Sequence, residues 1–288
     1  MKTALINRRS FLRRAIRGAA GGLYLSNSTA RGSISTKRKL SKIGVQLYTV
    51  RKELEADFES TLAKVAALGF IEVEFAGYFN HRPQQIREVL ARNHLSAPSA
   101  HVTTSMLRSN LQQTIEAAAI IGHRYVICGY LPAEERRSLD DYKRLIELFN
   151  HAGEQFSKAG LQFGYHNHDF EFVPIEGQYP YDLILAGTSP QTVKMEMDLY
   201  WITKAGQSPL RYFSKYPGRF PLVHVKDMDG TSKRFFTEVG RGVIDFRQIF
   251  TAARQAGIEH YFVEQDETPG SPFASLKMSM DYLKRLKF

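Results

Sequence analysis

The sequence contains little cysteine and no long apolar run. Cys128 is the only cysteine among 288 residues, so no intramolecular disulfide can form. No stretch reaches the roughly 20 apolar residues that a membrane-spanning helix needs. Cys128 ends the apolar run Tyr125–Cys128, where we expect a buried small hydrophobe rather than a nucleophile. These absences exclude a disulfide-stapled scaffold and predict a protein without a stable membrane span.

Acidic residues are absent from the first 42 positions. Eleven of the 39 Lys and Arg residues lie in Met1–Lys42, which contains none of the 29 Asp and Glu residues. Ile43–Phe288 then has 28 basic and 29 acidic residues, so its formal charge is near −1. The net charge of +10 therefore belongs to a leader. A nearly neutral body argues against a nucleic-acid partner, which would need a basic face.

The leader resembles a bacterial twin-arginine export signal. Paired arginines open the run Arg8–Leu12, and a mild apolar stretch and a small-residue cleavage site at Ser28–Ala30 follow it. We expect a signal peptide over 1–30, a basic linker over 31–42 and a folded domain over 43–288. Cleavage after Ala30 would leave a charge near +4. This signal predicts the twin-arginine export machinery as a partner and the periplasm as the location. The alternative for the leader is a basic tail that touches nucleic acid or anionic lipid.

Short β-branched runs alternate with longer amphipathic stretches after Lys42. Helical stretches end at glycines such as Gly122 and Gly257, and Asp57 and Asp245 are expected helix N-caps. Eight expected strands span Ile43–Leu47, Ile71–Phe75, Ser96–His101, Tyr125–Cys128, Gln162–His166, Val193–Asp198, Leu222–Val225 and Tyr261–Glu264. Eight such units over about 245 residues predict a (β/α)₈ TIM barrel. A doubly wound open sheet is the competitor, but no glycine-rich phosphate fingerprint follows the first strand.

Polar side chains gather where the expected strands end. In a barrel these ends meet at the C-terminal mouth, where catalysis occurs. Carboxylates and imidazoles that converge there need a cation or a partner, and such mixed sets suit one divalent metal ion such as Mn²⁺, Zn²⁺, Co²⁺ or Mg²⁺. Four other histidines fall in loops or at helix ends, where we expect solvated surface positions: His94, His123, His151 and His260.

Several longer motifs resemble the sugar phosphate isomerase/epimerase family, whose fold is a xylose isomerase-like TIM barrel. The resemblance covers roughly residues 42–288. The motifs that carry it are Tyr165–Phe172, Met197–Trp201, Leu222–Met228, Glu238–Asp245 and Val263–Asp266. The family holds one divalent metal with a carboxylate from strand five, Asp from strand six, His from strand seven and Glu from strand eight.

The last three ligands carry over to Asp198, His224 and Glu264, but strand five departs from the pattern. It offers His166 where the epimerases have Glu, and we assign His166 as the fourth ligand. His168 is the alternative, because residues two apart on a strand face the same side.

The histidine puts the family's two-glutamate acid/base pair in doubt. Glu264 would keep its half of the pair, and the other base must come from Glu74, His101, Lys226 or His168. Lys226 beside a metal would have a lowered pKa and act as acid, base or oxyanion stabiliser. Its alternative role is a salt bridge to Asp227 or Asp198.

Aromatic and basic side chains near the expected mouth are candidates for substrate contacts. His101 and a loop arginine, Arg241, would hold substrate oxygens, although a plain loop arginine is the alternative. Four aromatic residues would stack on the apolar face of a sugar or pack in the core: Tyr48, Phe75, Tyr165 and Trp201.

The reaction that the resemblance implies is proton abstraction next to a carbonyl, with the metal as Lewis acid. The first hypothesis is a sugar isomerase or epimerase. An exported enzyme would meet free sugars, keto-sugars or glycosides rather than phosphorylated sugars. The second hypothesis is a periplasmic lyase or hydratase for 3-keto-glycosides. The third is a sugar-binding barrel without catalysis. A homo-oligomer is left open.

Overall fold

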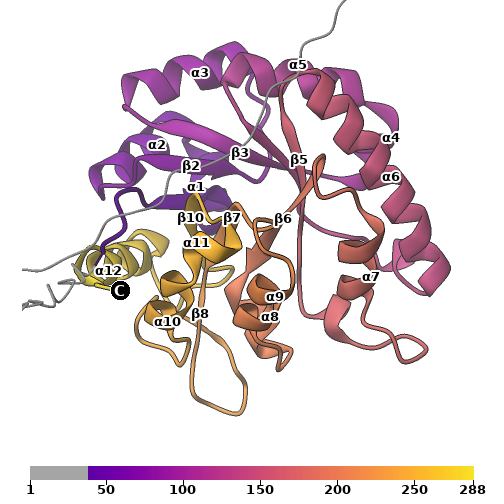
Figure 1. Cartoon of the computed structure of the whole chain (residues 1–288). Helices are drawn as coiled ribbons and strands as arrows, with labels where there is room; N and C mark the ends of the chain where they lie inside the picture. The colour runs from indigo at the N-terminus through magenta and orange to yellow at the C-terminus, as the bar shows by residue number, and fades with distance from the viewer. Residues whose placement is uncertain (1–37) are drawn as a thin grey trace, which may run out of the picture. The chain divides into compact units, whose positions relative to one another are not determined.

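The structure is a computed structural model that describes residues 38–288, so the expected export signal and most of the linker lie outside the described residues. Eight parallel strands close into a barrel in the order β1-β10-β7-β6-β5-β4-β3-β2 (Figure 1). The barrel strands are β1 (Gly44–Gln46), β2 (Glu72–Phe75), β3 (Ser96–Val102), β4 (Tyr125–Cys128), β5 (Gln162–His166), β6 (Val193–Asp198), β7 (Leu222–Val225) and β10 (His260–Val263).

Helices connect the strands and lie around the outside of the barrel (Figure 1). They are α1 (Arg51–Ala56), α2 (Phe58–Ala67), α3 (Pro83–Arg92), α4 (Thr104–Ser109), α5 (Leu111–Ile121), α6 (Leu139–Lys158), α7 (Pro180–Gly187), α8 (Leu199–Lys204), α9 (Pro209–Lys215), α10 (Phe246–Thr251), α11 (Ala253–Ala256) and α12 (Pro272–Arg285). Short 3₁₀ turns are η1 (Leu47–Val50), η2 (Ala133–Glu135) and η3 (Phe170–Phe172). None of the helices among the described residues has the length and apolar character needed to cross a bilayer.

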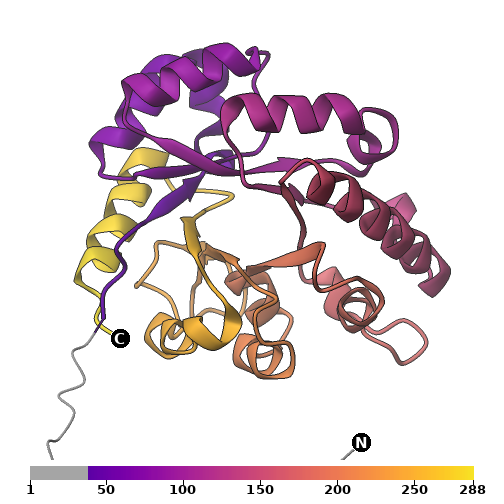
Figure 2. The same cartoon turned by 45° about the horizontal axis from the view of Figure 1, so that its top comes forward.

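The closed sheet confirms the predicted (β/α)₈ barrel and excludes the open sheet. Four of the eight strands have the expected bounds, β2 and β3 differ by one residue at one end, and β1 and β10 differ by one residue at both ends. The sequence did not indicate a small antiparallel hairpin after β7, formed by β8 (Asp227–Met228) and β9 (Phe236–Thr237). The ends of the domain also meet, because the backbone groups of Arg38 and Phe288 exchange two hydrogen bonds beside α12, which is drawn in yellow (Figure 2).

The expected helix caps are present. The Asp57 side chain accepts a hydrogen bond from the backbone N–H of Ser60 at the start of α2, and Asp245 does the same for α10. Gly122 and Gly257 end α5 and α11 with φ of +96° and +85°, in the left-handed conformation that glycine adopts without steric cost.

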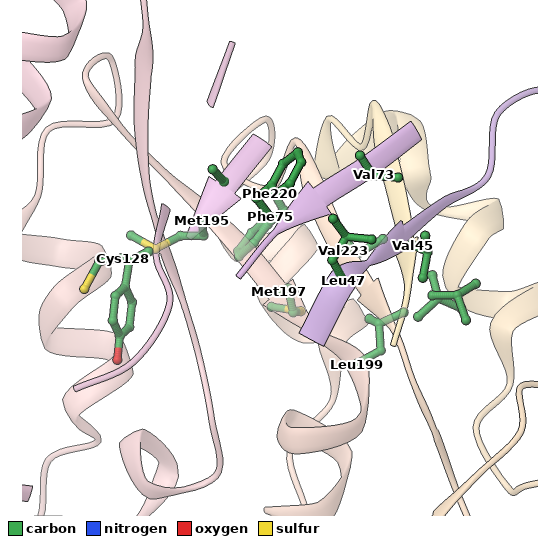
Figure 3. Close-up of a cluster of buried hydrophobic side chains, with 14 of the residues drawn as sticks. Val45, Leu47, Val73, Phe75, Cys128, Met195, Met197, Leu199, Phe220 and Val223 are labelled. Atoms are coloured by element: carbon green, nitrogen blue, oxygen red, sulfur yellow. The ribbon is translucent and has the colours of Figure 1, made fainter. Parts of the chain in front are cut away.

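Strand alternation divides the interior into two apolar regions. Outward side chains such as Val45, Val73 and Val223 pack in the core between strands and helices (Figure 3). Inward side chains fill the lumen, whose floor is made of Tyr125, Ile127, Leu222 and Phe262, all fully or almost fully buried.

Glycine makes room for that floor. A Cβ on Gly44 would lie 2.5 Å from the Phe262 ring, and one on Gly164 would lie 2.6 Å from Cδ1 of Ile127. The lower lumen is therefore filled mainly by apolar side chains, apart from Glu72 and His260, and the polar groups that meet at His224 are carried by the upper part of the strands.

Candidate metal centre at the barrel mouth

Four side chains from four neighbouring strands converge at the mouth. His166 ends β5, Asp198 ends β6, His224 lies in β7 and Glu264 directly follows β10. One ligand atom from each lies within 4.8 Å of the others. Their side chains are at most 6% exposed. The structure thus brings together the quartet that the resemblance implied as metal ligands; we call it the mouth cluster.

The donor atoms of the mouth cluster fit a divalent cation. Nε2 of His166 and Nδ1 of His224 face each other at 3.1 Å, an arrangement in which only one nitrogen can hold a proton. Oδ2 of Asp198 lies 3.4 Å from Nε2 of His166 and accepts no well-aligned hydrogen bond, although it is buried. Two imidazole nitrogens with two carboxylates suit Zn²⁺, Mn²⁺ or Co²⁺ better than Mg²⁺, which prefers oxygen ligands.

The backbone that directly follows Asp198 holds its side chain in place. Its Oδ1 accepts hydrogen bonds of 2.8 Å from the backbone N–H groups of Tyr200 and Trp201 and so caps α8. The other oxygen, Oδ2, is left to face the cluster. A strand that passes directly into a helix therefore fixes the direction of a functional carboxylate.

Lys226 lies beside the mouth cluster among three carboxylates. Its Nζ is 3.1 Å from Asp198, 2.7 Å from Glu264 and 2.5 Å from Asp266. Burial opposes the charge, but these carboxylates raise the pKa of Lys226 well above its ordinary value. Three anions outweigh the desolvation here; the lowered pKa that we expect for Lys226 beside a metal ion stays a prediction for the metal-bound site.

Glu264 and Asp266 titrate in opposite directions around that lysine. Burial alone would raise the pKa of Glu264, but Lys226 and His224 hold it well below its ordinary range. For Asp266, burial dominates and raises the pKa to about 6. The expected ion pair of Lys226 with Asp198 is present.

The alternative ion pair of Lys226 with Asp227 is wrong. The Asp227 carboxylate instead accepts hydrogen bonds from the backbone N–H groups of Met228, Gly240, Gly242 and Ile244. Asp227 therefore anchors the loop after β9, whose tip carries Arg241.

A second group of polar side chains lies deeper in the lumen. Glu74, His101 and Glu196 meet the opposite nitrogen of His224, and we call these three residues the inner cluster. Nε2 of His224 lies 2.7 Å from Oε2 of Glu74 and 3.3 Å from Oε2 of Glu196. Gln46 donates a 2.8 Å hydrogen bond to Glu74.

His101 supplies the cation of the inner cluster. Its Nε2 lies 2.7 Å from Glu196 and 3.3 Å from Glu74. Burial lowers the pKa of His101, but the two glutamates overcome this and raise it to about 10. We expected Glu74 and His101 to face the open mouth. The His101 side chain is 16% exposed, whereas Glu74 is fully buried, with Oε2 close to His101 and His224 and Oε1 without a hydrogen-bond partner.

His168 lies outside the mouth cluster, which answers the choice between His166 and His168 geometrically. Its ring centroid is 4.9 Å from that of His166, and it packs against Phe170 and Trp201. Burial is the largest cause that holds the pKa of His168 well below its ordinary value, so the imidazole is neutral. Its Nδ1 has no hydrogen-bond partner among the described residues.

The candidate substrate contacts differ in position. Trp201 is half-buried, with its ring 5.5 Å from Nζ of Lys226. Tyr48 is 41% exposed and stacks against Arg51. The Arg241 side chain is exposed and has no hydrogen bond or ion pair with any other described residue.

Phe75 and Tyr165 are not substrate contacts, because both are fully buried on the outer side of the barrel. Phe75 packs against Phe58 of α2, and the Tyr165 hydroxyl donates to Glu171. Each lies next to an inward residue in its strand and therefore points outward.

Two of the four histidines expected at the surface are buried. His123 places Nδ1 2.6 Å from the carbonyl of Ala97 and Nε2 3.1 Å from the Tyr78 hydroxyl. His260 lies in the lumen with Nδ1 2.8 Å from Glu72. His94 and His151 are exposed, and Cys128 is buried, as expected.

Glu196 and Asp266 are residues of the site that we did not single out from the sequence. Each lies two positions from an assigned ligand, Glu196 before Asp198 and Asp266 after Glu264. The period-2 alternation of a strand places such pairs on one face, so that signal was available.

Known proteins with similar sequences include two dehydratases. The inosose dehydratase of Lacticaseibacillus casei is 23% identical over 270 residues, which cover 80% of this chain and 89% of that protein. The inosose dehydratase of Geobacillus thermodenitrificans is 22% identical over 269 residues, with 80% and 90% coverage.

Solved structures show the same architecture. A sugar phosphate isomerase/epimerase from Parabacteroides distasonis superposes with a TM-score of 0.74 at 28% identity, over 88% of this chain and 95% of that one. The IolI protein, solved with a zinc atom, shares the fold with a TM-score of 0.68 at 12% identity, over 83% of this chain and 95% of that one. Residues 62–286 match the family described as xylose isomerase-like TIM barrel. The chain belongs to this family.

Proposed function

We propose that the protein is a divalent-metal-dependent enzyme that removes a proton next to the carbonyl of a non-phosphorylated keto-sugar or keto-cyclitol. The observation that carries this proposal is the convergence of His166, Asp198, His224 and Glu264 beside Lys226. We assign these four residues as the metal ligands. Lewis-acid polarisation of a substrate carbonyl is the chemistry that a divalent ion would supply there.

Lys226 and His168 are our candidates for proton transfer. Three carboxylates keep Lys226 protonated, so it can donate a proton or stabilise negative charge that develops on a substrate oxygen. His168 is neutral and carries an unpartnered Nδ1, so it can accept the proton from carbon. Glu74 lies too deep for either role, and we propose that it positions His224 instead.

Elimination of water or of another β-substituent suits this pair better than epimerisation does. Epimerisation needs two bases on opposite faces of one carbon, and the strand-five glutamate that would be one of them is His166 here. Elimination needs one base and one acid, which His168 and Lys226 provide. The dehydratase relatives support the same choice.

The isomerase or epimerase hypothesis remains the alternative, with Glu264 as one of the two bases. Export to the periplasm through the twin-arginine route stays part of the proposal, and it rests on Arg8–Leu12 and the residues that follow them. That location is the reason for proposing a substrate without a phosphate group.

The test is an assay of the purified protein loaded in turn with Zn²⁺, Mn²⁺, Co²⁺ and Mg²⁺. Each form would be mixed with a free ketose, an inosose and a 3-keto-glucoside. We expect one bound ion per chain and loss of water or of the aglycone. Interconversion of ketoses without elimination would replace the lyase with an isomerase. Absence of metal and of turnover would leave a sugar-binding barrel.

A further inference from the structure

Five aromatic rings form a continuous row along one side of the mouth. We call this row the aromatic arc; its members are Tyr130, His168, Trp201, Phe236 and Phe235. Successive ring centroids lie 5.2, 5.4, 5.7 and 5.1 Å apart in that order. These separations are those of directly packed aromatic pairs.

The arc crosses four consecutive loops. Tyr130 follows β4, His168 follows β5, Trp201 lies in α8 after β6, and the two phenylalanines lie at β9 after β7. These strands are neighbours around the barrel, so the row extends along half of the mouth. The other half is polar: Thr49, Arg51 and Asp266 line a cavity of about 530 Å³ there.

The middle of the arc borders the mouth cluster. Nζ of Lys226 lies 5.5 Å from the Trp201 ring and 5.6 Å from the Phe236 ring. A sugar that reacts beside Lys226 therefore reaches the inner rings. Tyr130 and Phe235 stand one ring further out at the two ends, and a single sugar ring at Lys226 does not extend to them.

The end rings are the solvent-facing ones. Tyr130 is 49% exposed and Phe235 is 43% exposed, whereas Trp201 and Phe236 are half-buried and packed against the core. A single exposed aromatic side chain needs no explanation, but these two end a contiguous row of packed rings, and contiguous apolar surface is typical of a binding site. The rings behind them are supported from below, so the surface is preformed.

We propose that the aromatic arc is a second subsite that takes a ring attached to the reacting sugar, which makes the substrate a glycoside with at least two rings. The bound group is a six-membered ring with an apolar face, either an aryl ring or a second sugar. This inference rests on the proposed function of the mouth cluster, and it narrows the substrate class from a free keto-sugar to a keto-glycoside.

Continuity with the charged site favours a ligand over a protein partner. The Trp201 ring lies beside both Lys226 and His168. His168 in turn packs against Tyr130, so one small molecule that extends along the arc contacts both regions. Arg136 adds a polar edge, because it lies 3.6 Å over the Phe170 ring and donates to the Tyr130 hydroxyl. A glycosidic oxygen and a ring hydroxyl would find donors at that edge.

Binding can be measured without turnover. Phenyl β-glucoside, cellobiose and glucose carry no carbonyl next to an acidic carbon in the pyranose form, so they serve as inert probes. The Zn²⁺-loaded full chain would be titrated with each by calorimetry. Trp201 is the only tryptophan, so its fluorescence reports contact with the arc directly.

We expect both two-ring probes to bind at least 10-fold more tightly than glucose and to change the Trp201 emission. Tyr130→Ala should weaken the two-ring probes by about 3- to 10-fold, which is the range for a lost aromatic contact. Phe235→Ala removes a ring at the other end of the arc, away from the polar edge that Arg136 provides, and should leave their affinity unchanged. Glucose affinity should not change. Ile71→Ala is the matched control, because Ile71 is a similarly exposed (42%) apolar residue that precedes β2 at the opposite end of the barrel.

Three results would overturn the subsite. If glucose and the two-ring probes bind with equal affinity, there is no second subsite. If Tyr130→Ala lowers the affinity for glucose and for the two-ring probes equally, the arc only stabilises the structure around the mouth cluster. A wild-type dimer that dissociates in Tyr130→Ala, with probe binding unchanged, would make it a contact between two copies. Zn²⁺ binding and turnover of a free inosose are measured separately, so the metal-enzyme proposal can survive each result.

Discussion

The mouth cluster and the inner cluster contain the same residue types and share His224, yet they balance charge differently. In the inner cluster, each glutamate lies within 2.7 Å of an imidazole nitrogen, and protonated His101 supplies the positive charge. In the mouth cluster, two imidazole nitrogens face each other and Oδ2 of Asp198 accepts no hydrogen bond. Buried oxygens without a hydrogen-bond partner remain in both clusters, but only in the mouth cluster do two imidazole nitrogens face each other, an arrangement that a bound cation would relieve.

The difference shows that a group of carboxylates and histidines is not in itself a metal site. In both clusters, one ligand atom from each residue lies within 4.8 Å of the others. What separates them is what the imidazole nitrogens face: carboxylates alone in the inner cluster, and also another imidazole nitrogen in the mouth cluster. A ligand histidine usually donates its second N–H to a carboxylate, and Glu74 occupies that position behind His224. The inner cluster is thus the support of the mouth cluster.

The largest effect is expected from Asp198→Asn. Asparagine keeps the oxygen that caps α8 but removes the anionic ligand, so the helix remains and metal affinity falls more than about 100-fold, with loss of turnover. Equilibrium dialysis with metal analysis measures it. Glu196→Gln, two residues earlier on the same strand face, is the control and should still bind one ion. Equal losses in both variants would make the two clusters equivalent.

The Lys226→Gln variant should retain the bound metal but lose most of its catalytic activity. Removing the proton donor should lower kcat by about 10²- to 10⁴-fold, the usual contribution of a general acid or base. Metal affinity should not fall, because the carboxylates lose a competing cation. Steady-state kinetics and metal content are read on the same sample. A fully active variant would assign the acid role to another group.

Glu74→Gln should weaken metal binding by about 10- to 100-fold without abolishing it, because it removes the charge that orients His224. Competition with a chromophoric chelator measures this change. Glu72→Gln is a matched control on the same strand: Glu72 also faces the lumen but pairs with His260 instead. Unchanged affinity in Glu74→Gln would leave the inner cluster with a structural role only.

Glu171 offers a third case, a buried carboxylate whose side-chain hydrogen-bond partner is a tyrosine rather than a lysine or a histidine. Burial raises its pKa from 4.5 to about 7 despite hydrogen bonds from Tyr165 and His168. Because the folded state holds this proton more tightly, its contribution is full below pH about 4.5 and is lost as pH rises to about 7.

The free energy of unfolding of the wild type should therefore fall between pH 5 and pH 8. In Glu171→Gln this decrease should be smaller by up to about 3 kcal/mol, and metal affinity should not change. Urea unfolding at the two pH values measures the difference. Glu154→Gln, an exposed position on α6, should retain the wild-type slope. Parallel slopes in all three proteins would contradict the raised pKa.

The barrel was predictable from local periodicity, and the mouth quartet from the family resemblance placed on those strands. Strand ends in a parallel barrel share one face, so Asp198, His224 and Glu264 had to meet. The same alternation would have turned Phe75 away from the site, since Glu74 beside it faces inward. It would also have placed His260 in the lumen if we had predicted that the last strand begins one residue earlier.

Other features depend on contacts between distant segments and have no local signal. His123 is buried because Tyr78, 45 residues earlier, covers it. The raised pKa of Lys226 depends on three carboxylates that two other strand ends supply. The inner cluster required knowing that Glu74 and His224, 150 positions apart, meet across the lumen.

The filled floor of the lumen makes the site a blind chamber with a single opening. Tyr125, Ile127, Leu222 and Phe262 close the lower end, so metal, substrate and product share one route in and out. A ligand bound at the mouth would then block the only route by which a bound ion can leave. Ion exchange should become slower as ligand occupancy rises, and reloading would have to wait for product to depart.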